Sequence, residues 1–307
     1  MARIARAGAS PAHGVLLLDK PAGITSTRAL AVAKRVLGAP KAGHAGTLDP
    51  FATGLLPLVF GEAAKFARFL VDAQKTYEAT LRLGEETASG DPECPVTRRS
   101  PVSVTAQEID AVLATFLGEQ RQVPPMHSAI HVGGRRLYEY ARAGEEIERT
   151  PRAITIAAIA ALGRSGDDLA IRVTCSKGTY VRTLAQDIGR RLGCGAHLVA
   201  LRRTAIGHLS AAAAVTLARL EALGAAARGL LLPPEALVAA LPRFDASAPE
   251  AAGFAHGRPI ATSAAPGSEV AVYAPGGRFL GVGTGLADRI APLRLISPPA
   301  AKSPDFA

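Results

Sequence analysis

Residues 41–62, KAGHAGTLDPFATGLLPLVFGE, hold four glycines and two prolines among many apolar side chains. This composition predicts a buried, irregular loop that is followed by a short strand or helix. Backbone that is buried and irregular must find unusual hydrogen-bond partners. Because such segments often carry function, the stretch is the first place to look for a site.

Within this stretch, Asp49 is the residue with the most unusual context. It precedes Pro50, which disfavours helical backbone at Asp49. It also lies among apolar residues such as Leu48 and Phe51, where burial would raise the pKa of its carboxyl unless a cation keeps it ionised. An aspartate that caps a local turn is the competing interpretation, and composition alone does not exclude it.

Outward from this stretch, periodicity and turn signals predict an α+β chain. Strands are expected at 14–18, 77–83, 154–160 and 169–175, and helices at 26–37, 106–117 and 181–192. Thr25 or Ser26 can cap the first helix and Gly38 can end it. Residues 211–241 are expected to form Ala/Leu-rich helices that break at Pro233-Pro234.

Two further regions differ from this core. Residues 121–152 are rich in Arg, Gly and Glu, which predicts an insertion that leaves the core. Residues 244–307 contain short β-like runs, with 274–277 as a hairpin loop, and end in a Pro- and Ala-containing tail. We therefore expect a first domain at 1–243 and a small all-β module at 244–307.

The charge of the chain is basic and unevenly spread. Lys and Arg number 35 against 26 Asp and Glu, a net charge of +9. Residues 1–41 and 172–203 each hold seven basic residues and one acidic residue, whereas 244–307 are balanced at five of each. If the fold joins the two stretches they would form a phosphate-binding face, and otherwise they are two solvated helix faces.

Cysteine use and hydropathy restrict the protein class. Three cysteines in 307 residues give neither a disulfide framework nor zinc-ligand spacing, and Cys175 and Cys194 are expected to pack as small apolar residues. No apolar run approaches the roughly 20 residues that span a bilayer. We expect a cytoplasmic protein with no membrane partner.

Four segments, in order, carry a resemblance to a known family. They are GVLLLDKP at 14–21, GHAGTLDP at 43–50, KTY at 75–77 and SKGTYVRT at 176–183. Together with PPMHSA at 124–129 and GRRLYEYAR at 134–142, they resemble the bacterial tRNA pseudouridine-55 synthases of the TruB family. The resemblance covers roughly residues 13–300.

The resemblance implies a pseudouridine synthase fold. Its central mixed, mainly antiparallel sheet is flanked by helices, with an RNA-gripping insertion and a small C-terminal β-barrel (PUA-like) domain. It also implies isomerisation of the T-loop uridine of tRNA without a cofactor. The expected partner is the T-stem-loop of tRNA, bound by a monomer with no obligate protein partner.

The resemblance further implies three catalytic residues. Asp49 would be the carboxylate, attacking the base, attacking C1′, or removing a proton to give a glycal, and the sequence does not choose among these. Arg182 would keep Asp49 ionised, although a basic segment alone fits a phosphate contact equally well. Tyr77 would be a stacking platform for the uracil, where an ordinary strand tyrosine is the alternative.

Other residues are implied to bind the substrate or support the site. His44 would hold the flipped T-loop, with a core histidine bonded to backbone as the alternative, and Leu201 would touch the uracil. Lys20 and Tyr180 would support the site wall, and Asp91 would bind RNA or serve a turn. Phosphate contacts are expected from Arg135, Arg142 and Arg202.

Two positions depart from the usual family pattern. The family usually has Lys where this chain has His131, and commonly Thr where it has Ala64. Both departures affect expected RNA contacts rather than the reaction. Three rival functions remain: a non-catalytic RNA-binding protein, a synthase acting on another RNA, and a glycoside hydrolase, which would need a second carboxylate.

Overall fold

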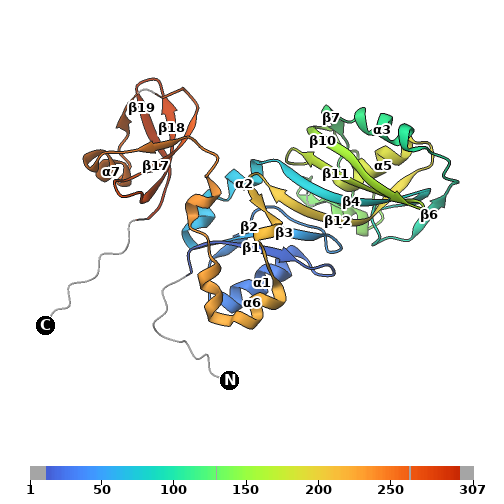
Figure 1. The fold of residues 1–307 in the computed structure, drawn as a ribbon, viewed down its shortest axis with the longest axis horizontal. Coiled ribbons are helices and arrows are strands. Elements are labelled where there is room, and N and C mark those ends of the chain that lie inside the picture. The colour runs from blue at the N-terminus through green and yellow to red at the C-terminus, as the bar shows by residue number, and fades with distance from the viewer. Residues whose placement is uncertain (1–11, 129, 263, 298–307) are drawn as a thin grey trace.

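The computed structural model describes residues 12–128, 130–262 and 264–297, and its core is one long mixed sheet (Figure 1). The strand order is β14-β1-β3-β12-β4-β11-β10-β7, with β13 on β12 and β2 on β3. Most neighbouring strands are antiparallel, while β1 runs parallel to β14 and β12 parallel to β3. The predicted α+β class and mainly antiparallel sheet are confirmed.

The N-terminal elements form as the sequence predicts. β1 (Gly14–Lys20) is almost wholly buried and leads into α1 (Ser26–Leu37). The side chain of Thr25 caps α1 by accepting from the backbone N–H of Arg28, and Gly38 ends it with φ of 60°. α1 lies beside α6 (Leu217–Leu223) at one end of the sheet (Figure 1).

The loop that carries Asp49 joins two paired strands. β2 (Ala42–His44) and β3 (Thr53–Phe60) are antiparallel, and residues 45–52 connect them. The expectation of an irregular loop followed by a short strand is met, and β3 is buried along nearly its whole length.

The middle of the sheet contains one strand that the sequence did not predict. β4 (Lys75–Leu83) and β11 (Asp168–Cys175) match predicted strands, but β12 (Ala196–Ile206) lies between β4 and β3. β12 lacks the alternation that marks a half-exposed strand, because it is covered by neighbours over most of its length. In its register with β4, Arg203 lies opposite Tyr77.

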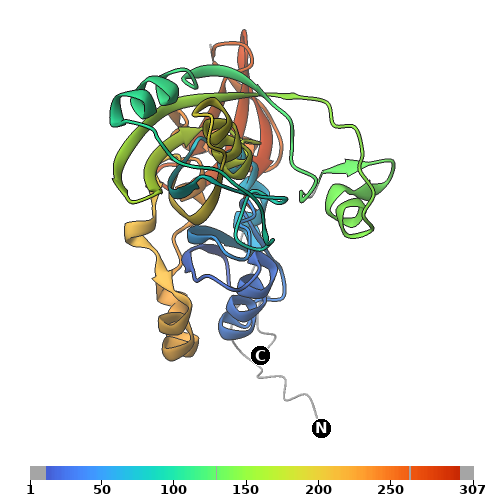
Figure 2. The same cartoon turned by 90° about the vertical axis from the view of Figure 1, so that its right-hand side faces the viewer.

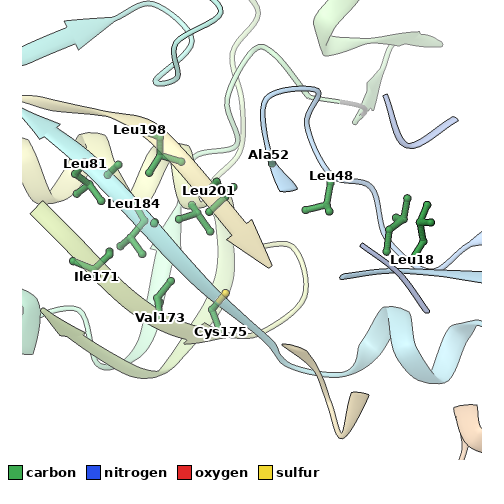
Figure 3. Packing of buried hydrophobic residues seen from close by; sticks show 14 of the residues in the cluster. Leu18, Leu48, Ala52, Leu81, Ile171, Val173, Cys175, Leu184, Leu198 and Leu201 are labelled. Carbon is green, nitrogen blue, oxygen red and sulfur yellow. The ribbon is translucent and has the colours of Figure 1, made fainter. Parts of the chain in front are cut away.

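The main core lies between this sheet and the helices behind it. Figure 3 shows side chains from β4, β11, β12 and α5 (Val181–Arg191) gathering there, among them Leu81, Val173, Leu184 and Leu198. Cys175 and Cys194 are buried and free, as expected for small apolar residues. α3 (Ala106–Ala114) packs nearby and opens with the capping box of Thr105 and Glu108.

The helices expected at 211–241 form differently from the prediction. β13 (Leu209–Ser210), η2 (Ala211–Ala213) and β14 (Val215–Thr216) precede the short α6, and 3-10 turns η3 (Gly224–Leu230) and η4 (Pro234–Leu237) follow it. Gly224, at φ of 52°, ends α6, and Pro233 and Pro234 prevent continuation. Local Ala/Leu propensity therefore overstated the helix content.

The predicted insertion leaves the sheet and returns to it. β7 (Gly118–Gln122) pairs with β10 (Arg152–Ser165), and between them lie β8 (His131–Val132), β9 (Arg135–Arg136) and α4 (Leu137–Arg142). Figure 2 shows this small hairpin and helix standing apart from the sheet. Ala129, part of a quoted motif, lies outside the described residues.

A second sheet forms the C-terminal module. It contains β15 (Arg243–Asp245), β17 (Glu269–Tyr273), β18 (Phe279–Leu286), β19 (Arg289–Leu295) and β16 (Ile260–Ala261), in that order. α7 (Ala248–Ala255), which the sequence did not predict, covers part of it. The expected tail at 298–307 lies outside the described residues.

The C-terminal module packs closely on the rest of the chain. η1 (Gly61–Phe66) and α2 (Arg68–Asp72) follow β3, and the ring of Phe66 lies 5.3 Å from that of Phe279. Lys65 Nζ donates to the carbonyl of Leu295 at 3.1 Å. The remaining strands, β5 (Glu85–Thr87) and β6 (Val96–Arg99), form a separate hairpin.

Candidate active site

The backbone next to Asp49 is held by Ser26 at the start of α1. Ser26 Oγ accepts from the Leu48 N–H at 2.9 Å and donates to the Leu48 carbonyl at 3.0 Å. Ser26 is only 2% exposed, so water does not compete for these bonds. On the other side of Asp49, its carbonyl accepts from the Ala52 N–H at 3.1 Å, which closes a turn.

Lys20 supports the same loop from β1. Its Nζ donates to the carbonyls of Pro21 (2.8 Å), Ile24 (2.8 Å) and Pro50 (3.1 Å). The side chain is completely buried, and burial lowers the pKa of Lys20 to about 8. A surface lysine is therefore excluded, and the position matches the expected support of the site wall.

Arg182 brings together the Asp49 loop, Asp91 and the insertion. From the first turn of α5, its Nε lies 3.0 Å from Asp49 Oδ2, and its Nη1 lies 3.2 Å from Asp91 Oδ2. Its Nη2 also donates to the carbonyl of His127, in the insertion, at 2.8 Å. The side chain is 5% exposed, so Arg182 is a buried cation shared by two carboxylates.

Opposing effects act on the Asp49 carboxyl. Burial raises its pKa, Arg182 lowers it, Asp91 raises it, and the net direction is upward. Arg182 thus opposes the rise, as the sequence predicts, without reversing it. The Asp49 side chain keeps 34% of its surface accessible, whereas that of Asp91 keeps 2%. Asp49 is the carboxylate of this pair that a substrate can reach.

Asp91 has both a turn role and a charge role. Its Oδ1 accepts from Ser89 Oγ at 2.5 Å and from the Glu93 N–H at 3.0 Å, as a turn aspartate would. Its Oδ2 faces Arg182. No signal in the sequence predicts that Asp91 is buried against Arg182, the partner of Asp49.

Tyr77 and Leu201 lie on neighbouring strands of the sheet. Tyr77 is on β4 and partly buried, and Leu201 is on β12 and 7% exposed. Burial raises the pKa of the Tyr77 hydroxyl, and the guanidinium of Arg203 opposes that rise. Figure 3 shows Leu201 at the end of the apolar cluster that is nearer Leu48 and Ala52 of the loop.

His44 and Tyr180 are placed by different contacts. Among the described residues, Nδ1 of His44 is buried without a hydrogen-bond partner, and burial, followed by Arg203, lowers the pKa of the ring. Tyr180 is tied through its backbone to Gln122, whose Oε1 accepts from the Tyr180 N–H at 2.8 Å.

The basic stretches 1–41 and 172–203 contact each other, but many of their cations form ion pairs with acidic residues. Arg202 binds Asp19 through two bonds, Nη1–Oδ1 at 3.0 Å and Nη2–Oδ2 at 2.8 Å. Arg172 pairs with Glu78 at 2.8 Å and Lys177 with Asp72 at 2.7 Å. Exposed pairs of this kind are weak, so phosphates can displace the acids. Net charge along the sequence therefore overstated the free positive surface.

The basic residues of the insertion lie over aromatic rings. Arg135 lies 4.2 Å from the Tyr140 ring centroid and 3.4 Å from Glu145 Oε1, and Arg142 lies 5.4 Å from the Tyr138 ring. His131, the departure from the usual lysine, has Nε2 3.4 Å from Arg136 Nε. These side chains remain at the surface.

Two hollows of the described surface lie away from Asp49. One of about 260 Å³ is lined by residues such as Phe116 and Arg190, and one of about 350 Å³ by residues such as Arg82 and Arg99. Neither is lined by Asp49. Among the described residues, no group of His, Cys, Asp or Glu is arranged to hold a metal ion.

Within residues 12–128, 130–262 and 264–297, no helix is long and apolar enough to cross a membrane.

Sequence reasoning missed the residues that hold the loop. The sequence indicates Ser26 only as a helix cap, and it places Arg203 only in a basic stretch and in the segment 201–203, which extends the family resemblance. Gln122 was not singled out, although it is 4% exposed and bonds both backbone groups of Tyr180. A buried polar residue beside a functional loop is the available signal, and burial is not visible from one sequence.

Comparisons with known proteins agree along most of the chain. Residues 34–181 match the model of the TruB family pseudouridylate synthase N-terminal domain. Residues 182–239 match the tRNA pseudouridylate synthase B C-terminal domain, and residues 242–296 match the pseudouridine synthase II TruB C-terminal model.

Relatives and solved structures extend the match. A Dechloromonas aromatica protein named tRNA pseudouridine synthase B is 55% identical over 271 residues, covering 88% of this chain and 90% of the relative. A protein of the same name from Azoarcus is 54% identical over 285 residues, which cover 92% of this chain and 95% of the relative. The solved Cbf5-Nop10-Gar1 complex contains a chain that is similar to this one, with a TM-score of 0.74 and 26% sequence identity. The match covers 94% of this chain and 86% of that chain.

The mixed sheet and its C-terminal β module are therefore the fold of the pseudouridine synthases. Within that class, the chain belongs to the TruB family of pseudouridylate synthases.

Proposed function

We propose that this protein isomerises the uridine at position 55, in the T-loop of tRNA, to pseudouridine. The observation that carries the proposal is the pairing of a partly accessible Asp49 with a buried Arg182. Relatives that share about half of its residues over nearly their whole length are named tRNA pseudouridine synthase B, which supports tRNA as the substrate.

The reaction rearranges bonds without oxidation or reduction. The N1–C1′ bond breaks, the uracil turns, and C5 bonds to C1′. C5 then loses its proton, and N1, no longer bonded to the sugar, carries one. Because atoms and electrons balance within the nucleotide, we propose that the enzyme needs no cofactor.

Asp49 supplies the negative charge at the reacting sugar or base. It attacks the base, attacks C1′, or removes a proton to form a glycal, and all three routes remain open. Arg182 keeps Asp49 ionised and oriented through the 3.0 Å contact of its Nε. Without that cation, burial beside Asp91 would favour the neutral acid.

Tyr77, Leu201 and His44 receive the base. A tyrosine ring can stack on uracil before and after the ring turns, and its hydroxyl is available for the C5 proton. Leu201, at the end of the apolar cluster, contacts the other side of the uracil. The unpaired Nδ1 of His44 is available to the RNA group that holds the flipped loop.

Supporting residues fix these groups in place. Lys20 holds the Pro50 carbonyl, and Tyr180 begins α5, which carries Arg182. Asp91 shares Arg182 and so restrains its guanidinium. We assign these residues to the wall of the site.

Exposed cations bind the RNA backbone. Flipping the base out of the stack costs a few kcal/mol, and phosphate contacts offset that cost. We assign such contacts to Arg135, Arg142 and Arg202, with Arg202 leaving Asp19 when RNA binds. In this division residues 1–243 form the catalytic domain and residues 244–307 a PUA-like RNA-binding module with its tail.

We further propose that the enzyme works in the cytoplasm as a monomer and needs no obligate protein partner. Light scattering of the purified protein with and without tRNA tests this part. A constant monomer mass for the protein component is expected, and a dimer that alone has activity would contradict it.

The experiment for the main proposal maps the product on RNA. An unmodified tRNA transcript is incubated with the enzyme and pseudouridine is located chemically, beside a transcript with cytidine at position 55. We expect one modified position in the first and none in the second. Modification elsewhere would refute the substrate assignment, and no modification would refute the activity.

A further inference from the structure

We propose that Arg203 is a positioning residue for this reaction, which fixes the loop that carries Asp49 and supplies positive charge beside Tyr77. The inference rests on the proposed function. Arg203 lies on β12 between β4 and β3, opposite Tyr77 on one side and Gly54 on the other. It is 1% exposed and is the largest of the fully buried side chains.

The guanidinium binds backbone on both sides of Asp49. Nη2 donates to the Gly46 carbonyl at 3.1 Å and Nη1 points to the Thr47 carbonyl at 3.4 Å, both in the loop before Asp49. Nε donates to the Leu55 carbonyl, on β3 after the loop, at 2.8 Å. A planar fork with several donors can hold carbonyls before and after Asp49 at once, with a geometry that a lysine ammonium cannot reproduce.

Gly54 in the same region leaves room for the backbone of Arg203. Gly54 has φ of 97°, and a Cβ there would lie 2.3 Å from the Arg203 carbonyl. At Gly46, with φ of 104°, a Cβ would make only ordinary contact with Arg203 Nη1, at 3.5 Å. Strand β3 can therefore pack closely against the backbone of this arginine only with glycine at position 54.

The charge of Arg203 is not neutralised by an acid. In the described part of the chain, its hydrogen-bond partners are backbone carbonyls and the Tyr77 side chain, and no ion pair involves it. The positive charge therefore acts on its neighbours, opposing the rise that burial causes in the Tyr77 pKa and lowering the pKa of His44. A tyrosine that handles the C5 proton benefits from such a cation because its anionic form is stabilised.

Substitution of Arg203 separates positioning from folding. We compare Arg203→Lys and Arg203→Ala with Arg82→Ala, which removes an arginine from the same strand as Tyr77 but breaks only a half-exposed pair with Asp168. Single-turnover rate, KM, tRNA affinity and thermal unfolding are measured for each. Guanidinium ion is then added at concentrations too low to denature the protein.

The expected result is a rate effect at constant affinity. Arg203→Ala should lose about 100-fold in rate, as a small displacement of reacting groups does, with KM and tRNA affinity little changed. Added guanidinium should restore at least part of that rate in Arg203→Ala and none in Arg82→Ala. Arg203→Lys, which keeps the charge, should fold and show a smaller loss of rate.

The outcomes that overturn the inference are distinct from failure of the proposed function. If the wild type makes no pseudouridine, the proposed function fails. If the wild type is active and both Arg203 variants keep its rate, the positioning role is wrong. It is equally wrong if the rate lost by Arg203→Ala is not recovered by guanidinium. Should Arg203→Ala not fold, an unchanged rate in Arg203→Lys alone refutes the role.

Discussion

The loop of residues 45–52 and the insertion use positive charge in opposite ways. Around residues 45–52, Lys20 and Arg203 are buried and donate to backbone carbonyls. In the insertion, Arg135 and Arg142 remain at the surface and lie over tyrosine rings. The first arrangement fixes a geometry, and the second leaves cations available to phosphate.

Energetics explain why the two regions differ. Burying a cation is costly, and the cost is recovered only when good hydrogen bonds replace water. Removing one such group leaves buried carbonyls without donors, which costs about 1–3 kcal/mol for each unsatisfied group. An exposed ion pair is worth about 0–1 kcal/mol, so an insertion cation can exchange partners at little cost.

The largest effect is expected from Arg182→Met. The change leaves Asp91 buried without its cation, a situation that costs about 3–5 kcal/mol. It also removes the partner of Asp49, so the rate should fall by about 10²–10³-fold or more. Urea unfolding and single-turnover assays test both parts. Arg172→Met, which breaks an exposed pair with Glu78, should cost no more than about 1 kcal/mol, and equal losses in the two variants would contradict the contrast.

The second effect is the pH dependence of stability that Lys20 creates. Its pKa is about 8 in the folded protein against an ordinary 10.5. Between these values the unfolded chain binds more protons, so the free energy of unfolding rises with pH across this window and is flat below it. Each pKa unit corresponds to about 1.4 kcal/mol.

The free energy of unfolding is measured with urea at several pH values, from below pH 8 to above it. In Lys20→Met this free energy should rise less steeply with pH than in the wild type. The rise that remains is attributed to Lys75, whose pKa is also lowered to about 8. Lys177→Met changes an exposed lysine and should leave the slope intact. If Lys20→Met keeps the slope of the wild type, burial does not lower the pKa of Lys20 in the folded protein.

A smaller effect is expected from Ser26→Ala. The variant leaves both backbone groups of Leu48 without their partner, which costs about 1–3 kcal/mol and loosens the position of Asp49. Thr25→Ala, the matched control, removes the neighbouring helix cap and costs about 1 kcal/mol. Both variants should unfold earlier, but only Ser26→Ala should lower the single-turnover rate. A rate loss in both would assign the effect to α1 as a whole.

The smallest effect is expected in the insertion. Arg135→Gln removes a surface cation, so tRNA binding should weaken a few-fold. The slope of log affinity against log salt concentration should become shallower by about 1, which corresponds to one lost phosphate contact. The rate at saturating tRNA should not change, because no loop contact is lost. The control is Arg219→Gln, which removes an exposed arginine on α6, outside the insertion. Affinity is measured over a salt series, and a rate loss at saturating tRNA would instead indicate a catalytic defect.

Local signals predicted the fold where one side chain decides the backbone. Thr25 and Gly38 set the ends of α1, and the Thr105–Glu108 box opens α3. β12 was missed because its coverage by neighbouring strands depends on residues far along the chain. The helices at 211–241 were overstated because Ala and Leu favour helix locally while Gly224 and Pro233 interrupt it.

The sequence indicated which residues form the candidate site but not which of them contact each other. Family resemblance indicated Asp49, Tyr77 and Arg182, whereas no spacing in the sequence places residues 49 and 182 within 3.0 Å. Counting charge could not reveal that Glu78 and Asp72, outside the basic stretches, pair with their cations. A buried arginine in a basic segment looks the same in sequence as one that binds phosphate.

The most direct test of the account is the single-turnover rate of Asp49→Asn on unmodified tRNA, measured together with tRNA affinity. The variant keeps the shape of the side chain and the neighbouring contacts but removes the charge that Arg182 faces. The account predicts tRNA affinity close to that of the wild type and no detectable pseudouridine. Pseudouridine formed by Asp49→Asn at a rate near that of the wild type would contradict it.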